Sequence, residues 1–387
     1  MCDYMEIYNS KLLSINAEIK NNSIELYSEG ILSIIIKPIL NKINNIFKNE
    51  KAIKIDNDKI IFSSWVPPFP SIQFNRMIHS EIEYFLLKKR IPDQLSISVT
   101  SKCPNKCIHC GAFDFMNKNN NDISIEKIKE IVQQSTELGS YLITIDGGDP
   151  NTRKDIYELI KSINNEKIIL SMFTSGYNIT YNNALNLKNA GLYSLKISLD
   201  STKEEKHDFF RGRKGSYNEV INAIKNSKRA GILTDLYITL SPYNIDELES
   251  FYDFGSELLV DEITLTGIIA IGKWKDHEEE IITKNDLKKI EQFHIIKNKL
   301  KNGPRISALP YLFGKKMFGC FAGRRWMHIT NNGDAMPCPY TPIIFGNIYQ
   351  QNLNKIWENM KNSSIYKNEC YECRMRNLEF RKKYINK

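Results

Sequence analysis

The sequence lacks any uninterrupted apolar run of about 20 residues, the length that a helix needs to cross a bilayer. Its most apolar stretch, residues 31–40, is broken by Lys37 and Pro38. The N-terminus also lacks the charged and apolar segments of a secretory signal peptide. We therefore expect a cytoplasmic protein without a membrane span, in a compartment where cysteines hold metals more often than they form disulfides.

Long runs of one charge are also missing. The net charge is +8 over 387 residues, but the lysines are spread over predicted helical faces rather than gathered in runs. Such a spread is typical of a solvated surface, so the charge alone does not predict nucleic-acid binding, and an RNA-modifying enzyme remains a minor alternative. The length predicts two or three domains with a substantial core.

Cysteine is scarce, with eight in the chain, and seven of these fall into two groups. The first group, Cys103, Cys107 and Cys110, has C-x3-C-x2-C spacing and follows the apolar run 94–100. Four thiolates would close an iron–sulfur cube, whereas three leave one iron open, as a reactive metal centre requires. The alternatives are a zinc knuckle or structural thiols, but zinc sites are usually built from C-x2–4-C pairs.

This motif at the end of a predicted first strand resembles that of the radical S-adenosylmethionine (SAM) superfamily. The resemblance implies a [4Fe-4S] cluster on the three cysteines, whose open iron holds the amino and carboxylate groups of SAM. An electron from the reduced cluster then cleaves SAM, and a 5′-deoxyadenosyl radical abstracts hydrogen from a substrate. It further implies a reducing partner such as flavodoxin or ferredoxin. His109 stands where many members carry an aromatic residue near the adenine.

From residue 93 to about residue 300, short β-rich runs alternate with helical stretches, which predicts parallel βα units. Six units predict an open partial barrel, and the resembled family typically has a TIM-like (β/α)6 core. The predicted strands are 95–100, 141–146, 167–173, 194–199, 234–240 and 262–266, and the predicted helices are 124–138, 153–164, 180–190, 216–230, 244–258 and 284–300.

Polar and glycine-rich segments follow these strands, at the end of a barrel where chemistry is found. Gly147-Gly148-Asp149-Pro150 resembles the family's GGEP segment with Asp in place of Glu, and Arg211 lies in a stretch whose family arginine pairs with the SAM carboxylate. A guanidinium fork suits a carboxylate. The resemblance implies SAM contacts at Gly147, Gly148, Asp149, Ser175, Ser198, Asp200 and Arg211.

The second cysteine group lies beyond residue 300, where the alternation stops. Cys320 and Cys338 flank a predicted hairpin with Asn332-Gly333 at its turn, and a predicted helix at 353–360 leads back to Cys370 and Cys373. Four thiolates can saturate one metal centre, and their spacing alone leaves a zinc site open. The segment resembles the SPASM domain and its shortened relative, the twitch domain, which implies one auxiliary [4Fe-4S] cluster.

The predicted organisation has three parts: an α+β leader region at 1–92, the barrel at 93–303 and a small hairpin-plus-helix cluster domain at 304–387. In the leader we predict a helix at 31–47, a hairpin at 52–62 that turns at Asn57-Asp58, and a helix at 80–89. The extended segment Trp65–Pro70 is expected to strap the leader onto the barrel, with peptide binding or lining of a substrate channel as the alternative.

Together these features predict a radical SAM oxidoreductase or maturase that oxidises or cross-links a peptide or protein. A dehydrogenase of a small metabolite such as an amino sugar is the alternative, and a non-catalytic zinc scaffold is an alternative of another class. An epimerase with a thiol hydrogen donor is not expected, because only Cys2 is spare. The auxiliary cluster could accept an electron or be structural. No acid or base is assigned, and Tyr340 and Trp274 are interpreted as packing residues.

Overall fold

The computed structural model describes residues 3–20, 23–48, 50–56, 58–116, 122–300, 302–315, 317–368 and 370–385. Cys2, and Asn57 of the predicted leader turn, lie outside these residues. Within the ranges that the structure describes, no helix is both long enough and apolar enough to cross a membrane.

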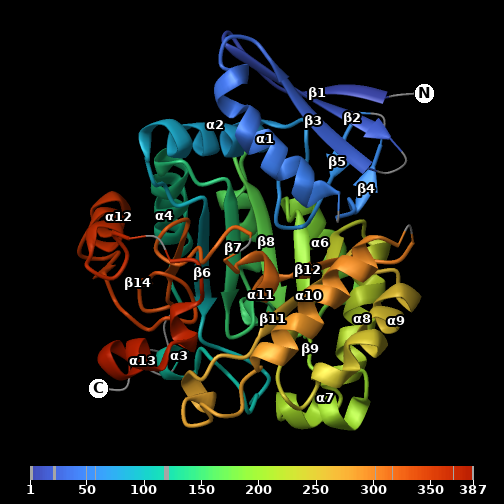
Figure 1. The fold of residues 1–387 in the computed structure, drawn as a ribbon. Coiled ribbons are helices and arrows are strands. Elements are labelled where there is room, and N and C mark those ends of the chain that lie inside the picture. The colour runs from blue at the N-terminus through green and yellow to red at the C-terminus, as the bar shows by residue number, and fades with distance from the viewer. Residues whose placement is uncertain are drawn as a thin grey trace.

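The leader region begins with three antiparallel strands, which lie at the top of Figure 1. They are β1 (Asp3–Ser10), β2 (Leu13–Lys20) and β3 (Ser23–Glu29), and helix α1 (Ser33–Phe47) packs beside β3. Alternate apolar side chains, such as Ile7 and Ile15, are buried under α1 and the following segment. The sequence analysis predicted the helix but not the strands.

The rest of the leader contains the predicted hairpin, β4 (Lys54–Ile55) and β5 (Ile60–Ile61), and helix α2 (Ile72–Leu87). Helix α2 begins at Ile72 rather than at residue 80, because Ser71 caps it by accepting a 3.0 Å hydrogen bond from the Phe74 N–H. An exposed Ile72 and a buried Ser80 blur the amphipathic pattern of its first turns. This helix carries the chain to the start of the barrel (Figure 1).

The predicted partial barrel of alternating strands and helices is confirmed, with parallel strands in chain order and helices outside them (Figure 1). The six strands are β6 (Gln94–Thr100), β7 (Leu142–Gly147), β8 (Ile169–Thr174), β9 (Ser194–Leu199), β10 (Leu233–Leu240) and β11 (Glu262–Gly267). The helices are α4 (Ile125–Leu138), α5 (Ile156–Ile163), α6 (Tyr181–Ala190), α8 (Ser216–Arg229), α9 (Leu248–Glu257) and α10 (Lys284–Asn298), with short α3 (Phe113–Met116) and α7 (Glu204–Arg211) in the loops.

The barrel sheet continues into the C-terminal region at both edges. Strand β12 (Arg305–Ala308) pairs with β11 just beyond residue 303, where we had placed the domain boundary. Strand β13 (Trp326–Ile329) pairs with β6, and β14 (Asp334–Met336) and β15 (Gly346–Asn347) follow it. Short helices α11 (Leu309–Leu312), α12 (Leu353–Asn362) and α13 (Leu378–Tyr384) complete the region. Both cysteine groups are therefore attached to one sheet.

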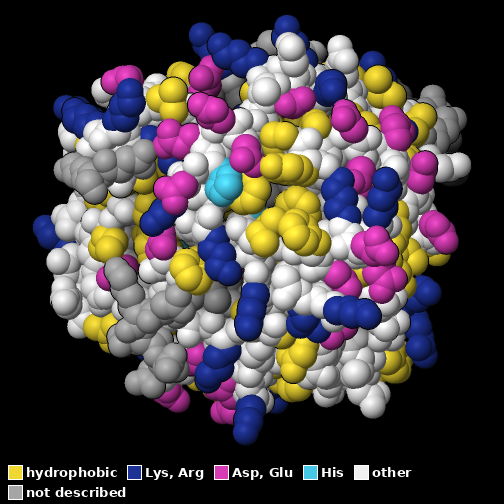
Figure 2. Space-filling model, turned by 90° about the horizontal axis from the view of Figure 1, so that it is seen from below, with side chains coloured by type: hydrophobic (Ala, Val, Ile, Leu, Met, Phe, Trp, Pro, Cys, Tyr) yellow, Lys and Arg dark blue, Asp and Glu magenta, His cyan; other side chains and the backbone are white. Residues whose placement is uncertain are grey.

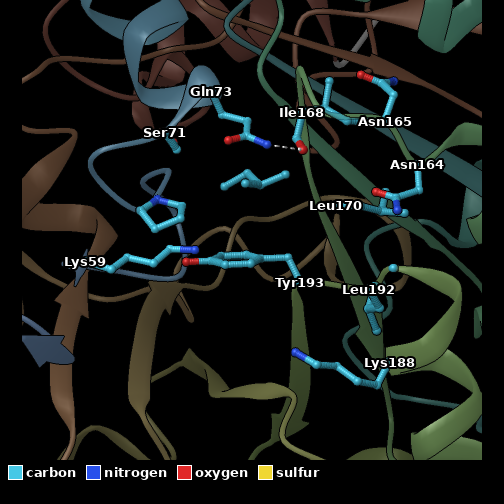
Figure 3. Close-up of a pocket in the computed structure, with 13 residues that line it drawn as sticks. Lys59, Ser71, Gln73, Asn164, Asn165, Ile168, Leu170, Lys188, Leu192 and Tyr193 are labelled. Carbon is cyan, nitrogen blue, oxygen red and sulfur yellow. Dashed lines mark hydrogen bonds between the residues drawn. The ribbon is translucent and has the colours of Figure 1, made fainter. Parts of the chain in front are cut away.

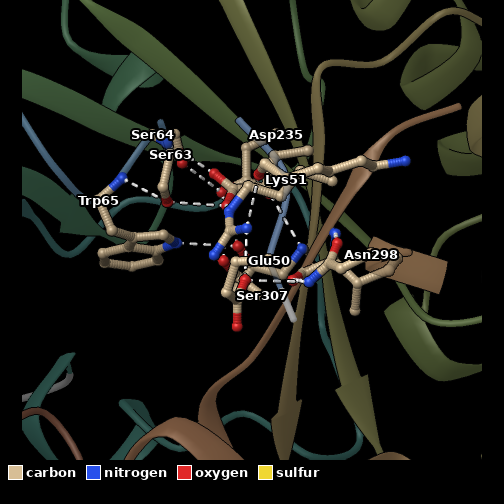
Figure 4. Close-up of polar contacts among 12 residues, drawn as sticks. Glu50, Lys51, Ser63, Ser64, Trp65, Asp235, Asn298 and Ser307 are labelled. Carbon is tan, nitrogen blue, oxygen red and sulfur yellow. Dashed lines mark hydrogen bonds and ion pairs between the residues drawn. The ribbon is translucent and has the colours of Figure 1, made fainter. Parts of the chain in front are cut away.

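The strand starts are closed by a buried polar network that leader residues 50–65 complete (Figure 4). The Lys196 ammonium lies 2.8 Å from the Asp235 carboxylate, and both side chains are fully buried. Arg305 joins Glu50 at 2.5 Å and Glu262 at 3.2 Å. Because buried charges need partners, this network anchors the leader across the base of the barrel.

Candidate functional site

A cavity of about 480 Å³ opens inside the barrel. The three cysteines of the first group line it, together with Gly147, Gly148, Ser175, Ser198 and Arg211. Its other walls mix polar and aliphatic residues with aromatic side chains, among them Trp65, Phe173, Tyr237, Trp326 and Tyr340. The cavity thus brings most of the predicted site residues to one place.

Trp65 closes this cavity on the leader side. Its indole N–H donates a 2.9 Å hydrogen bond to the Thr264 hydroxyl, and the Lys196 ammonium lies 3.7 Å from the centre of its ring. The segment Trp65–Pro70 therefore fastens the leader to the barrel, as we expected, and its first residue also lines the cavity.

The three-cysteine loop is held against the end of α7. The Lys106 and Ile108 N–H groups each donate a 3.0 Å hydrogen bond, to the carbonyls of Arg211 and Phe210. Burial raises the pKa of Cys103 to about 12, and the neighbouring thiols raise it further in their charged forms. Burial opposes deprotonation of these thiols, and the positive charge of a bound iron–sulfur core would offset this by stabilising the thiolates. The site therefore fits such a cluster.

The glycines after β7 allow this loop to pack closely. A Cβ on Gly148 would lie 2.1 Å from the Lys102 carbonyl oxygen, and Gly147 has φ of +133°. The Gly148 and Asp149 N–H groups donate 2.8 Å hydrogen bonds to the Thr100 and Lys102 carbonyls. The glycine pair therefore fixes the cysteine loop as well as lining the cavity.

The Asp149 carboxylate joins the ends of β7 and β8. It is buried, and its Oδ2 accepts hydrogen bonds from the Ser175 N–H at 2.9 Å and the Ser175 hydroxyl at 2.6 Å. The Thr174 hydroxyl donates to the same group at 3.1 Å. Burial raises the pKa of Asp149, and the Ser175 hydrogen bonds oppose this shift. The carboxylate lies behind the cavity wall, where it positions Ser175.

Replacing Asp149 with asparagine should destabilise the protein by about 1–3 kcal/mol. The wild-type carboxylate accepts hydrogen bonds with both oxygens, whereas asparagine has one acceptor oxygen, and its NH₂ group would face buried donors. Urea unfolding at pH 7, followed by tryptophan fluorescence, measures the loss. Asp276→Asn, at an exposed position, is the control. Equal stability of Asp149→Asn and wild type would show that the hydrogen bonds at β8 do not depend on the carboxylate.

Arg211, Asp200 and His109 form a buried polar group, of which Arg211 and His109 line the cavity. The Arg211 Nε lies 2.6 Å from Asp200 Oδ2, and the His109 Nε2 lies 3.5 Å from Oδ1. Burial opposes ionisation of Asp200, but the Arg211 guanidinium holds its pKa below the usual value. Arg211 Nη1 also lies 3.9 Å from the Cys107 sulfur.

The His109 ring leaves room for a ligand beside this group. Its Nδ1 atom is buried without a hydrogen-bond partner among the described residues, and the side chain lines the cavity. Buried polar atoms of this kind are usually satisfied by a ligand, an ion or water. The free nitrogen next to three cysteines and an arginine fits a polar, adenine-bearing molecule such as SAM.

The neighbouring His207 makes stability depend on pH. It accepts a 3.2 Å hydrogen bond from the Asp200 N–H through Nδ1, and burial lowers its pKa from 6.5 to about 4. Below pH 6.5 this histidine is protonated in the unfolded chain but stays neutral in the folded protein. The free energy of unfolding therefore decreases as the pH is lowered from 6.5 to about 4. Between pH 6.5 and 5, wild type should lose about 1.6 kcal/mol more than His207→Gln in urea unfolding. Parallel curves for the two proteins would contradict this.

The second cysteine group is gathered at the end of the C-terminal region. The Cys320 N–H donates a 3.1 Å hydrogen bond to the Cys370 carbonyl, and Gly333 turns the predicted hairpin with φ of +84°. Burial raises the pKa of Cys338 to about 12, with Cys373 close enough to raise it further. The four predicted ligands therefore lie in one neighbourhood.

Among the described residues, no three cysteine, histidine or carboxylate side chains form a group that could hold one metal ion. Zinc needs its sulfurs about 2.3 Å away, whereas an iron–sulfur cube spreads its ligands over several irons. The family comparison below decides between these two kinds of centre.

His328 is a cavity residue that the sequence analysis missed. It lies on β13 opposite Ser96 of β6, and its Nδ1 is 2.8 Å from the Ser96 hydroxyl. Ser98 lies 3.3 Å from Nε2 and donates a 2.7 Å hydrogen bond to Asp146. Burial lowers the pKa of His328, so the ring is neutral at pH 7. Only the β6–β13 pairing, which no local pattern reveals, brings this group into the barrel.

The end of the barrel that carries α7 is seen in Figure 2, where hydrophobic side chains gather near the centre of the face beside a histidine. An aromatic ladder runs along this end: Phe210 meets Tyr243, Tyr243 meets Trp274, and Trp274 stacks on His277 at 4.5 Å. Trp274 is therefore a packing residue, as predicted, whereas Tyr340 lines the cavity.

A second, smaller pocket of about 270 Å³ lies between the leader and the barrel, outside the main cavity (Figure 3). Lys59 and Gln73 of the leader face Tyr193 and Lys188 of the barrel across it. It shares no lining residue with the main cavity. The predicted chemistry therefore belongs to the main cavity alone.

Comparison with known families decides the assignment. The model of the radical SAM superfamily matches residues 97–255, and that of the SPASM iron–sulfur cluster-binding domain matches residues 320–375. The chain is a radical SAM enzyme with a C-terminal SPASM domain. These two domains imply a radical-generating [4Fe-4S] cluster, an auxiliary cluster and bound SAM.

Radical SAM relatives with curated names are distant in sequence. An AdoMet-dependent heme synthase of Methanosarcina barkeri is 22% identical over 290 residues, which are 69% of this chain and 82% of the relative. An Fe-coproporphyrin III synthase of the same organism is 28% identical over 176 residues, 46% of this chain and 44% of the relative.

Solved radical SAM structures share the fold. Streptococcus suis SuiB bound to the precursor peptide SuiA superposes with a TM-score of 0.59 at 17% identity, over 97% of this chain and 90% of that chain. The enzyme anSMEcpe with bound AdoMet and the Cp18Cys peptide gives a TM-score of 0.53 at 16% identity, over 74% and 83%. The fold of this chain is thus that of known radical SAM enzymes with SPASM domains.

Proposed function

We propose that this enzyme uses the first cluster and SAM to form a 5′-deoxyadenosyl radical in the barrel cavity and abstracts hydrogen there from a peptide or protein. In this proposal Cys103, Cys107 and Cys110 hold the radical-generating cluster. Cys320, Cys338, Cys370 and Cys373 hold the auxiliary cluster. A small electron carrier such as flavodoxin or ferredoxin supplies the reducing electron.

The proposed SAM site is the wall of the cavity beside the three cysteines. Arg211 offers a guanidinium fork for the SAM carboxylate, and His109 offers an unpartnered Nδ1. Backbone at Gly147 and Gly148 and the hydroxyls of Ser175 and Ser198 complete it. Asp149 and Asp200 are buried and hydrogen-bonded or ion-paired, so they act by positioning Ser175 and Arg211.

The observation that carries the peptide proposal is the superposition with SuiB over 97% of this chain. A match of that extent includes the leader region, and SuiB was solved with a precursor peptide bound. The curated heme synthase covers only 69% of this chain. In the proposed reaction the peptide loses hydrogen and becomes oxidised or cross-linked.

A tetrapyrrole substrate is the second candidate, because the names of the curated relatives point to it. The cavity carries cationic groups that suit a carboxylated ligand: Arg211, Lys106 and Lys273 line it. The same groups would also suit an acidic peptide, so the lining charge does not separate the two candidates.

Anaerobic turnover separates them. The reconstituted enzyme would be given SAM and a reductant with either iron-coproporphyrin III or any short peptide that is encoded beside its gene. The peptide proposal expects the amount of 5′-deoxyadenosine to rise above the substrate-free background when a peptide is added. The mass of that peptide should decrease by two hydrogen atoms for each oxidation or cross-link. Consumption of iron-coproporphyrin III without any change in the peptides would replace this proposal with the tetrapyrrole one.

A further inference from the structure

Two tyrosines meet inside the reaction cavity. The hydroxyl of Tyr237, on β10, lies 3.1 Å from the hydroxyl of Tyr340, which follows Cys338 in the C-terminal region. Both side chains line the cavity that also holds the three cysteines. The pair therefore bridges the barrel and the cluster domain across the space where radical chemistry takes place.

The surroundings keep this pair fixed and protonated. The edge of the Phe173 ring packs on Tyr237 at 4.8 Å, and Trp326 packs on Tyr340 at 6.4 Å. Burial raises the pKa of Tyr237, so its phenol keeps its O–H at neutral pH. Part of the Tyr340 side chain remains accessible, and it faces the cavity.

Among the described lining residues, these two carry the only phenols. The indole N–H groups of Trp65 and Trp326 already donate hydrogen bonds, to Thr264 and Ser96. The three cavity cysteines are the proposed cluster ligands. Among the lining side chains, the weakest available X–H bonds thus belong to the tyrosine pair, because a phenolic O–H bond is weaker than aliphatic O–H or C–H bonds.

We propose that the Tyr237–Tyr340 pair is a hydrogen-atom donor that quenches the primary carbon radical made from SAM when no substrate carbon lies in its path. The phenolic O–H bond of one tyrosine breaks and a C–H bond forms at the 5′ carbon, which gives 5′-deoxyadenosine. The unpaired electron stays on that phenoxyl oxygen, which the second hydroxyl stabilises by hydrogen bonding. The transfer is downhill and needs no further reactant. It depends on radical SAM chemistry but not on the substrate proposed above.

Deuterium content tests this without a substrate. The cluster-loaded enzyme would be reduced and given SAM in D₂O, and the deuterium content of the 5′-deoxyadenosine would be measured by mass spectrometry. Tyrosine O–H exchanges with D₂O whereas carbon-bound hydrogen does not, so wild type should give mainly singly deuterated product. Tyr237→Phe/Tyr340→Phe should lower the deuterated fraction several-fold and increase self-modification of the cavity lining. Tyr193→Phe, which lies outside this cavity, is the matched control and should match wild type.

An unchanged deuterated fraction in the double variant would overturn the proposal. If the double variant fails to fold, wild type made with ring-deuterated tyrosine decides, because a freeze-quenched tyrosyl EPR signal must narrow on this labelling. Absence of any tyrosyl signal in that sample would also overturn it. An enzyme that uses neither peptide nor tetrapyrrole would leave these results unchanged. An enzyme that makes no 5′-deoxyadenosine would overturn the radical chemistry and this proposal together.

Discussion

Replacing Arg211 with alanine is expected to lower the rate of SAM cleavage by about 100-fold or more. The guanidinium lies 2.6 Å from the buried Asp200 carboxylate, and both side chains are almost inaccessible. If the guanidinium fork donates two hydrogen bonds to the SAM carboxylate, at about 1.5–3 kcal/mol each, their loss corresponds to a factor of about 100 or more. Formation of 5′-deoxyadenosine under anaerobic reducing conditions, together with SAM affinity, measures the effect.

Arg213→Ala is the matched control for this prediction. Arg213 is close in sequence to Arg211, but its ion pair with Glu219 is partly exposed. Pairs of that kind contribute about 0–1 kcal/mol. Normal SAM affinity and cleavage in Arg211→Ala, with the cluster intact, would show that Arg211 does not hold SAM.

Replacing Lys196 with alanine should destabilise the protein by about 3–5 kcal/mol, because it leaves the Asp235 carboxylate buried without a cation. Lys196 also donates to Ser64 at 2.7 Å, so the change removes a link between barrel and leader. Urea unfolding of the cluster-loaded protein measures the loss. Lys289→Ala is the control, since Lys289 and its partner Asp246 are well exposed. If Lys196→Ala lowers the free energy of unfolding no more than Lys289→Ala does, the buried Asp235 carboxylate does not depend on Lys196 for its stabilisation.

The local features of this enzyme could be predicted from sequence. The cysteine motifs, the glycines after β7 and the alternation of strands and helices are each set by neighbouring residues. The strand Ser194–Leu199 and the helix start at Lys284, which Thr283 caps, follow from such patterns. The resemblance to radical SAM enzymes rests on these features, and the family matches confirm it.

Other features depend on contacts between distant segments. His328 enters the cavity only because β13 pairs with β6, more than 200 residues earlier, as the separation of 232 between Ser96 and His328 shows. Trp65 lines the cavity because its segment crosses the strand starts. Strands β1–β3 were missed although they do leave a local signal, because Leu13–Lys20 alternates apolar and polar residues as a half-buried strand does. The β6–β13 pairing and the position of Trp65, in contrast, leave no signal within one window of sequence.

The most direct test of the whole account is a count of iron and sulfide in protein purified and reconstituted without oxygen. Wild type should hold about eight irons, and the Cys103→Ala/Cys107→Ala/Cys110→Ala variant about four, with SAM cleaved only by wild type. The matched Cys370→Ala/Cys373→Ala variant should also lose about four irons yet still cleave SAM. A wild-type protein that binds zinc, holds no iron and leaves SAM intact would contradict the assignment of both cysteine groups.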